Sequence, residues 1–250
     1  MDSLLKGKLG QPSEPRRVGG HSSANEILLS LPETAFLSVC DSLEFVEMAR
    51  HSILHEPSKQ LEFVYFPSGG LISLVVAMED GKTVEAGVVG REGVVGTPLA
   101  VGLHRTPLRA IVQIPSSGFR IRAAALQAAL PGAPEFQMTL SRYAVIQGLQ
   151  VSQTAACNRL HDVEQRLARW LLMAIDRVHA DLLPVTHDFL ATLLGTDRPS
   201  VTLAAGTLQK KRAIEYTRGT VKVLNRDILQ DSACECYRVI QTLNSELGLP

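Results

Sequence analysis

One run near the C-terminus, from Leu183 to Ala204, constrains the fold more than any other stretch of this 250-residue chain. Apolar residues recur at helical spacing on both sides of Gly195, and small Ala191 allows two helices to approach closely. Gly195 suits the left-handed conformation that ends a helix. The run therefore predicts a helix, a three-residue turn and a second helix, the arrangement that places its second helix in the DNA major groove.

The residues at the predicted helix ends support this interpretation. Thr186 can cap the first helix and Asp197 the second, and Pro199 suits a first helical turn. Arg198 then projects from the leading end of the second helix, where a guanidinium can bond guanine O6 and N7 together. Arg198 is therefore the first candidate for reading a base, with a solvated helix-start arginine as the alternative.

Basic residues gather in the same part of the chain. The whole sequence has 25 Lys and Arg and 25 Asp and Glu, so its formal net charge is zero. The segment from Arg198 to Arg226, however, contains seven basic residues and a single acidic one, Glu215. Such local charge suits phosphate contacts, which position a protein without reading sequence. The further DNA-contact candidates are Thr186, Ser200, Thr202 and Thr207 through their hydroxyls, and Lys210, Lys211 and Arg218 through their charges.

Upstream, the region from about residue 53 to 121 has the texture of short strands. Its β-rich runs are 61–66, 71–78, 83–89, 109–114 and 118–121, separated by turn signals such as the one around Gly81. Short strands at this spacing predict an antiparallel β-roll or barrel. Helical spacing predicts one or two short helices over 25–48 and another over 123–130. Residues 1–23, rich in Gly, Pro and Ser, are expected to form a loose arm.

Residues from Glu135 to about His161 contain no Pro and only Gly148, so they predict one long helix. Four apolar residues in it fall near a seven-residue repeat, which two polar residues interrupt. The apolar residues are Met138, Val145, Leu149 and Ala156, and the polar ones are Arg142 and Ser152. Such a stripe predicts a two-helix seam between subunits, with packing on the chain's own domain as the alternative.

Three further elements complete the chain. Residues 162–178 predict an amphipathic helix, and residues 213–217 and 220–224 alternate around Arg218 and Gly219 as a two-stranded wing. The tail, 227–247, is expected to be helical at both ends around Cys234 and Cys236.

A β-roll, a long helix and a winged helix-turn-helix in this order resemble the Crp/Fnr family of transcription regulators. The resemblance covers nearly the whole chain from about residue 25 and is most specific in the last third, where Val185-Thr186, Gly195, Arg198 and Val201 match the family pattern. Residues 63–70 and 90–96 also resemble the family's sensor domain. Where the best-known pattern has an acidic residue and a second arginine, this chain has Pro199 and Leu203, so a different base preference is expected.

The resemblance implies an α+β fold in four parts. These are a flexible N-terminal arm (1–23), an antiparallel, jelly-roll-like β-roll sensor domain (24–132), a dimerisation helix (133–161) and a winged helix-turn-helix DNA-binding domain with a C-terminal tail (162–250). It further implies a homodimer on a two-fold operator in double-stranded DNA, with RNA polymerase as a partner. The operator sequence, and whether transcription rises or falls, are left open.

Other classes of function are less well supported. No nucleophile–base spacing, phosphate loop or metalloprotease motif is present, which argues against an enzyme. The absence of a long uncharged apolar stretch and of a secretory signal, with few scattered cysteines, favours a cytoplasmic protein away from membranes. The alternative from another class is a β-roll ligand-binding or protein-interaction module whose winged domain makes protein contacts.

The effector and cofactor remain unknown from the sequence. The glutamate with which cyclic-nucleotide members of the family bind ribose is missing after Gly96, which disfavours such a ligand and leaves Arg91, Glu92 and Arg109 as effector candidates. No N-terminal cysteine group is present, which disfavours an iron–sulfur cluster. No metal site is expected, because Cys234 and Cys236 are too few for zinc without distant partners. His161 is expected to flank a helix end, and the role of the two cysteines is left open.

Overall fold

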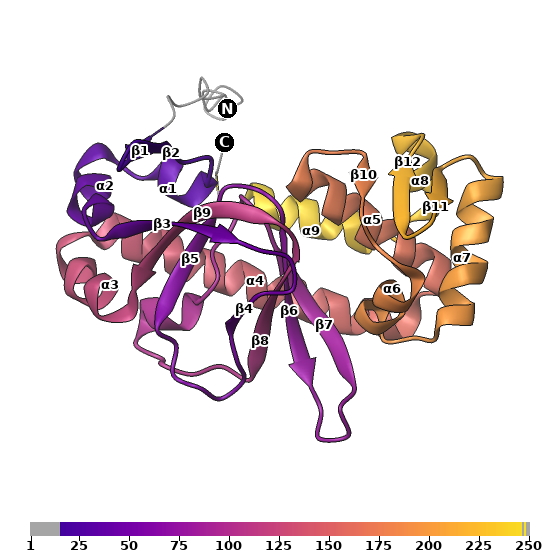
Figure 1. The fold of residues 1–250 in the computed structure, drawn as a ribbon, viewed down its shortest axis with the longest axis horizontal. Coiled ribbons are helices and arrows are strands. Elements are labelled where there is room, and N and C mark those ends of the chain that lie inside the picture. Colours follow the sequence, from indigo (N-terminus) through magenta and orange to yellow (C-terminus); the bar gives the residue numbers. More distant parts are fainter. Residues whose placement is uncertain (1–15, 247, 249–250) are drawn as a thin grey trace, which may run out of the picture.

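A β-roll and a helical domain lie at the two ends of the molecule, and one long helix, α4 (Pro134–Leu160), runs from the first to the second (Figure 1). The computed structural model describes residues 16–246 and 248. The other helices are α1 (Glu26–Ser30), α2 (Glu33–Cys40), α3 (Ala123–Ala129), α5 (Val163–Val178), α6 (His187–Leu194), α7 (Arg198–Lys210), α8 (Arg226–Ser232) and α9 (Cys236–Ser245), with 3-10 turns η1 (Thr97–Val101) and η2 (Leu130–Gly132). The strands are β1 (Arg17–Val18), β2 (His21–Ser22), β3 (Leu43–Met48), β4 (Ile53–His55), β5 (Phe63–Pro67), β6 (Leu71–Ala77), β7 (Thr83–Val89), β8 (Leu108–Ile114), β9 (Ser116–Arg122), β10 (Leu182–Leu183), β11 (Ile214–Thr217) and β12 (Thr220–Val223).

The β-roll consists of two antiparallel sheets, with strand orders β3-β9-β5 and β4-β8-β6-β7. Each predicted run between 61 and 121 forms a strand, shifted at its ends by no more than two residues. An apolar cluster fills the roll, and it includes Tyr65, Ile72, Leu74, Val89 and Val112. The predicted α+β architecture, with its antiparallel β-roll, is confirmed.

The prediction of one or two short helices over 25–48 is confirmed by α1 and α2 but is wrong for the last quarter of that range. Residues 43–48 form β3, which pairs with β9 along its whole length, from Leu43 opposite Ile121 to Met48 opposite Ser116. Leu43 and Val46 are three positions apart, a spacing that places two side chains on one face of a helix but on opposite faces of a strand. The pairing with β9 decides for the strand, since it satisfies backbone groups of both strands.

The described part of the expected loose arm is ordered. Residues 1–15 lie outside the described residues, and residues 17–22 form the β1–β2 hairpin. The ring of His21 stacks on Phe45 with centroids 3.8 Å apart, and the Arg16 guanidinium lies 4.5 Å from the centroid of the Phe36 ring. Both contacts hold the hairpin against the roll.

The second domain is built on α5. Asp162 and Gln165 form a reciprocal cap at its start, and the helix is apolar on the face that meets α7 and α8. The wing strands β11 and β12 pair antiparallel, and β10 extends them to a three-stranded sheet. Helices α8 and α9 flank Cys234, as predicted, and α9 returns to pack on α4. None of the described helices has the length and hydrophobicity of a transmembrane span.

Among residues 16–246, three polar contacts join the two domains. The Arg177 guanidinium on α5 lies 2.7 Å from a Glu92 carboxylate oxygen, and the Trp170 indole N–H donates to Glu85 on β7 at 2.8 Å. A third bond runs from the Arg50 guanidinium to the carbonyl oxygen of Pro184, at 2.7 Å. The first two are well shielded from water, so the interface between the domains is specific rather than a loose contact.

Candidate nucleic-acid interface

The helix-turn-helix has the caps that its sequence predicts. The Thr186 hydroxyl accepts a bond from the Phe189 N–H at 3.2 Å, and the Asp197 carboxylate accepts one from the Ser200 N–H at 2.7 Å. Gly195 ends α6 with φ of 59°. The apolar residues between the helices, Leu190, Leu194, Val201 and Ala204, are all buried. The outer face of α7 is therefore held in one orientation by its own domain.

A shallow depression in the protein surface lies along that outer face of α7. It is lined by Arg198, Pro199, Thr202, Leu203, Gly206, Thr207 and Lys210. Leu203 is 75% exposed, although it is apolar. The Arg198 guanidinium, also exposed, lies 3.4 Å from the carboxylate of Asp188 on α6. An exposed apolar side chain beside an arginine matches what a base edge offers, since the thymine methyl is apolar and guanine presents two acceptors.

The candidate hydroxyl groups differ in the hydrogen bonds that they already form within the chain. Thr202 donates to the Arg198 carbonyl oxygen at 2.9 Å, and its Oγ1 lies 2.9 Å from His187 Nδ1. Thr207 donates to the Leu203 carbonyl oxygen at 3.2 Å. His187 also stacks on Tyr216 of the wing, with centroids 3.9 Å apart. The sequence reasoning missed this His187 bridge, which holds α6, α7 and β11 together, because residue spacing does not show which side chains of neighbouring elements meet.

The candidate cations also separate into two groups. Lys210 is exposed at the end of α7, and Arg218 is exposed in the wing turn, with φ of 43°. Lys211 instead forms an ion pair with Glu164 of α5, which reduces its charge toward a ligand. Lys210 and Arg218 are therefore better placed than Lys211 to meet phosphates.

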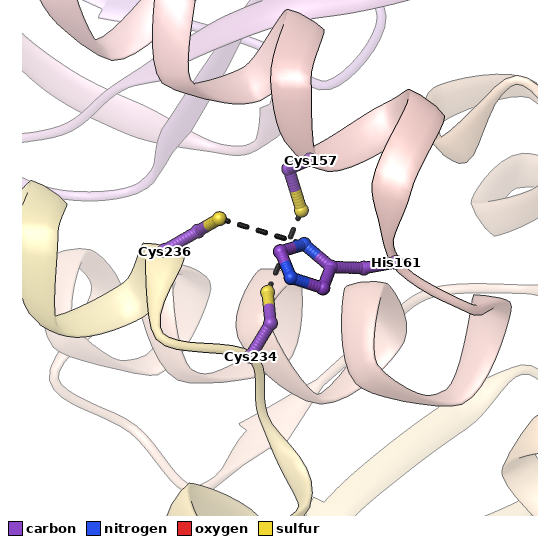
Figure 2. Close-up of side chains that lie close together, drawn as sticks. All are labelled: Cys157, His161, Cys234 and Cys236. Carbon is purple, nitrogen blue, oxygen red and sulfur yellow. Dashed lines mark hydrogen bonds between the residues drawn. The ribbon is translucent and has the colours of Figure 1, made fainter.

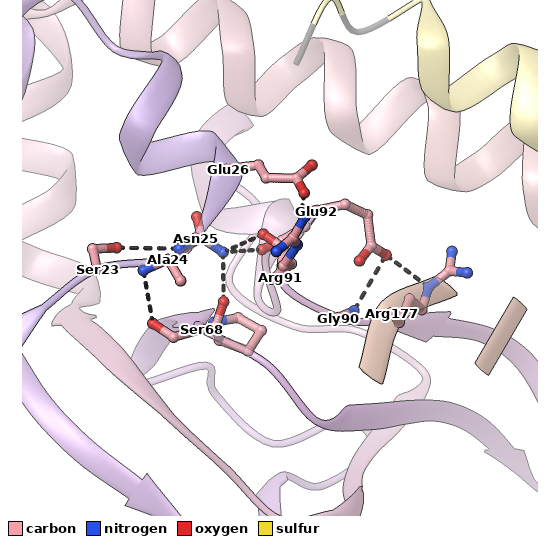
Figure 3. A network of polar contacts seen from close by, with 11 residues as sticks. Ser23, Ala24, Asn25, Glu26, Ser68, Gly90, Arg91, Glu92 and Arg177 are labelled. Atoms are coloured by element: carbon pink, nitrogen blue, oxygen red, sulfur yellow. Dashed lines mark hydrogen bonds and ion pairs between the residues drawn. The ribbon is translucent and has the colours of Figure 1, made fainter. Parts of the chain in front are cut away.

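The three effector candidates all form ion pairs, two of which are drawn in Figure 3. Arg91 lies 2.9 Å from Glu26 of α1, Glu92 pairs with Arg177, and Arg109 lies 2.7 Å from Glu56. No sequence pattern singled out Asn25, yet its amide donates to the carbonyl oxygens of Pro67, Arg91 and Gly93. These bonds make the 90–93 turn part of the framework that meets α5.

The same turn packs against α4 through Tyr143. A Cβ added at Gly93 would lie 1.9 Å from the Tyr143 hydroxyl oxygen, so only glycine fits there. Burial raises the pKa of Tyr143, which therefore stays a neutral phenol. The turn and the long helix are consequently in direct contact at this point.

Four side chains with metal-binding atoms also converge at the far end of α4. Cys157, His161, Cys234 and Cys236 bring these atoms within 4.8 Å of one another. The fold thus supplies the distant partners whose absence argued against a metal at Cys234 and Cys236. The spacing of Cys157 and His161, four residues apart on one helix face, was the signal in the sequence.

Comparisons with known proteins agree with this geometry. Residues 165–232 match the family of Crp-like helix-turn-helix domains. Comparison with the curated protein sequences gives no match.

Several solved structures share the fold. FixK2 from Bradyrhizobium japonicum aligns with a TM-score of 0.67 and 15% identity, over 77% of this chain and 98% of its own. CLP from Xanthomonas campestris, a global regulator responsive to c-di-GMP, aligns with a TM-score of 0.63 and 17% identity, over 76% and 98%. A CooA variant from Carboxydothermus hydrogenoformans gives 0.56 and 16%, over 86% and 97%. At these identities the likeness is one of fold.

The matched domain and the fold together define the class: this is a DNA-binding transcription regulator, which acts by binding rather than by catalysis. Its DNA-binding part is the Crp-like helix-turn-helix domain of residues 165–232, and the solved structures that share its fold include regulators of the CRP/FNR family. The match decides between the two hypotheses for the winged domain in favour of DNA.

Proposed function

We propose that two copies of the chain pair along α4 and bind a two-fold DNA operator, with the β-roll as the signal-sensing domain. The observation that carries this proposal is the face of α4 that the chain's own domains leave uncovered. Met138, Val145 and Leu149 are 61%, 63% and 47% exposed there. The opposite face of the same helix is buried on the roll through Phe136, Leu140, Tyr143 and Ile146.

The exposed face has the spacing of a two-helix seam. Its residues are Met138, Arg142, Val145, Leu149, Ser152 and Ala156, all of them exposed and separated by four and three residues in turn. A seam with this 3.5-residue average favours packing of two helices side by side. Gly148, on the same side, leaves room for a close partner. A second copy of α4 has the matching surface.

Pairing along α4 would relate two α7 helices by the same two-fold axis. Each could then enter the major groove of one half-site, with half-site centres about 34 Å, one DNA turn, apart. Arg198 would read a base, and Lys210 and Arg218 would contact phosphates. Ser200, Thr202, Thr207 and Thr186 are proposed for the remaining contacts.

A signal at the β-roll would act through the contacts between the domains. A ligand shifts a conformational equilibrium only if it binds the two arrangements with different affinity. The Arg177–Glu92 and Trp170–Glu85 contacts are the places where a shift of the roll would be felt by α5. The regulator would then promote or block RNA polymerase at the operator, in the cytoplasm, where the DNA is.

Two measurements test this proposal together. Sedimentation equilibrium of the purified chain gives its oligomeric state. A gel-shift series against salt gives the number of phosphate contacts, because the slope of log affinity against log salt is about −0.9 for each DNA phosphate that the protein neutralises. We expect a dimer and a steep salt dependence. A monomer on DNA, or an affinity that salt leaves unchanged, contradicts the proposal.

A further inference from the structure

The C-terminal tail meets the end of α4 at a cluster of three cysteines and one histidine (Figure 2). Cys157 and His161 come from the last turn of α4 and its end, and Cys234 and Cys236 come from the segment just before and at the start of α9. All three cysteines are buried, at 0%, 4% and 1% exposure, and their side chains form an apolar cluster of their own. Nothing in the proposed DNA-binding function uses these groups.

The distances fit one tetrahedral zinc ion. Two Zn–S bonds of about 2.3 Å at the tetrahedral angle hold their sulfurs about 3.8 Å apart, and one Zn–S with one Zn–N bond gives about 3.5 Å. The Sγ atoms of Cys157 and Cys234 are 3.5 Å apart, and Cys236 Sγ is 3.6 Å from His161 Nδ1. Three thiolates and an imidazole are also a donor set that structural zinc sites use.

The groups around the cluster would orient its ligands. The Nε2 atom of His161 lies 3.2 Å from a Glu235 carboxylate oxygen, while its Nδ1 faces the sulfurs. This is the arrangement in which a metal-binding histidine donates its second ring N–H to a carboxylate. The Gln153 amide also donates to Cys236 Sγ at 3.0 Å, and hydrogen bonds of this kind stabilise a thiolate.

The charge balance also favours a metal. A zinc ion with three thiolates and a neutral imidazole has one net negative charge. Two buried arginines of α5, Arg166 and Arg169, lie close enough to interact with the charge of Cys157. Their hydrogen bonds go to the Leu194 carbonyl oxygen and the Thr154 hydroxyl, both neutral, and within the described residues both Nε atoms have no partner. An anionic zinc–thiolate centre would supply a countercharge to both arginines.

Two other chemistries fit the cluster less well. A [4Fe–4S] cluster is held by four thiolates, and the fourth cysteine, Cys40, lies on α2 outside the cluster. Such a cluster also spaces its cysteine sulfurs further apart than one metal ion does. A disulfide would use two of the three thiols, and all of the cysteines are free.

We propose that Cys157, His161, Cys234 and Cys236 bind one zinc ion that fastens the C-terminal tail to the junction of α4 and α5. His161 ends α4, and the next residue, Asp162, caps α5. The ion would therefore lock α9 onto the point where the predicted dimerisation helix passes into the DNA-binding domain. On binding, the three thiols lose their protons to solvent and form thiolate–zinc bonds, with no change in oxidation state.

The test begins with the metal content of the intact wild-type chain. The protein is purified without chelators under a phosphine reductant and analysed by native mass spectrometry and elemental analysis. We expect one zinc per chain. Replacement of the zinc by Co²⁺ should give the intense d–d bands of tetrahedral coordination together with thiolate-to-cobalt charge-transfer bands. A chain that contains no zinc and takes up none when Zn²⁺ is supplied overturns the proposal, as does an iron–sulfur chromophore.

Variants then assign the ligands. Cys236→Ser should lose the zinc, whereas the matched control Cys40→Ser should keep it. Because Cys236→Ser can fail to fold, zinc affinity is also measured in the variant Glu235→Gln. This variant keeps all four ligands and removes only the carboxylate behind His161, so zinc affinity should fall by about 10- to 100-fold. Stoichiometric zinc in folded Cys236→Ser, or equal loss in Cys40→Ser, contradicts the assignment.

Discussion

Arg198, which we propose reads a base, already has a partner in the unbound chain. Its guanidinium lies 3.4 Å from the carboxylate of Asp188, and both side chains are about two-thirds exposed. An exposed pair of this kind contributes little to stability, because water screens it. Exchange of Asp188 for a guanine edge therefore costs little, and the pair keeps the guanidinium near the leading end of α7.

Arg198→Ala should weaken binding to the operator far more than binding to random DNA. If the contact is bidentate, the loss in discrimination is about 1–3 kcal/mol. Competition gel shifts with a selected duplex and a random duplex measure both affinities. Lys210→Ala is the control, since loss of a phosphate contact weakens both about equally and lowers the salt slope by about 1. An equal loss for both duplexes in Arg198→Ala removes its role in base reading.

Glu85 is a buried carboxyl group between the two domains. It accepts hydrogen bonds from Ser73 and from the Trp170 indole. Burial raises the pKa of Glu85 from 4.5 to about 7, against the opposing effect of its hydrogen bonds and of Arg169 and Arg177. The folded chain therefore holds a proton that the unfolded chain releases at lower pH.

The free energy of unfolding should consequently fall as pH rises from about 4.5 to 7, and this contribution should level off above that range. The difference is on the order of 3 kcal/mol over the whole range. Glu85→Gln keeps both hydrogen-bonding partners without the titration, so the slope should flatten. Urea unfolding at several pH values measures it, with exposed Glu215→Gln as the control. A slope that Glu85→Gln leaves unchanged refutes this account of Glu85.

At the scale of elements, α4 has two apolar faces that differ in their exposure to solvent. One is covered by the roll, and the other is exposed through Met138, Val145 and Leu149. Exposed apolar stripes of this extent on a helix mark an interaction surface.

Val145→Arg should therefore convert the dimer to a monomer, because it would bury two like charges opposite each other in the seam. Sedimentation equilibrium measures the change, and circular dichroism checks the fold. Leu37→Arg, at an apolar residue of α2 that is 57% exposed, is the matched control and should leave the dimer intact. If the Val145→Arg variant still sediments as a dimer, the dimer interface does not lie along this face of α4.

The sequence was sufficient to predict the elements whose ends are marked by capping residues or glycine. Thr186, Gly195 and Asp197 determine α6 and α7 by caps and backbone conformation, and these depend on neighbouring residues alone. It was insufficient for β3 and for the β1–β2 hairpin. The hairpin depends on stacking of His21 on Phe45, and β3 on pairing with β9, whose residues lie some 70 positions further along the chain.

The same reason explains which site residues were foreseen. The face of α7 was predicted because one helix presents it. The cluster of Cys157, His161, Cys234 and Cys236 needs the tail to return to α4 over 77 residues, from Cys157 to Cys234. The Glu92–Arg177 pair likewise needs β-roll and α5 in contact. The sequence contains the spacing within each segment, and only the fold determines which segments meet.

At the scale of the whole molecule, the Arg177–Glu92 pair joins the two domains in a shielded setting, with side chains only 5% and 15% exposed. Arg177→Met should destabilise the chain by about 3–5 kcal/mol, because it leaves the Glu92 charge buried and without its partner. Thermal and urea unfolding measure the loss. The double variant Arg177→Met with Glu92→Leu should recover much of it. A double variant no more stable than Arg177→Met shows that packing, rather than charge, is what the pair contributes.

The central claim is that two chains read one two-fold DNA site. Selection of duplexes from random sequence, followed by native mass spectrometry of the selected complex, tests it most directly. We predict selected sequences with two half-sites related by a two-fold axis, with centres about 34 Å apart, and two chains on each duplex. An asymmetric single site occupied by one chain would contradict the account.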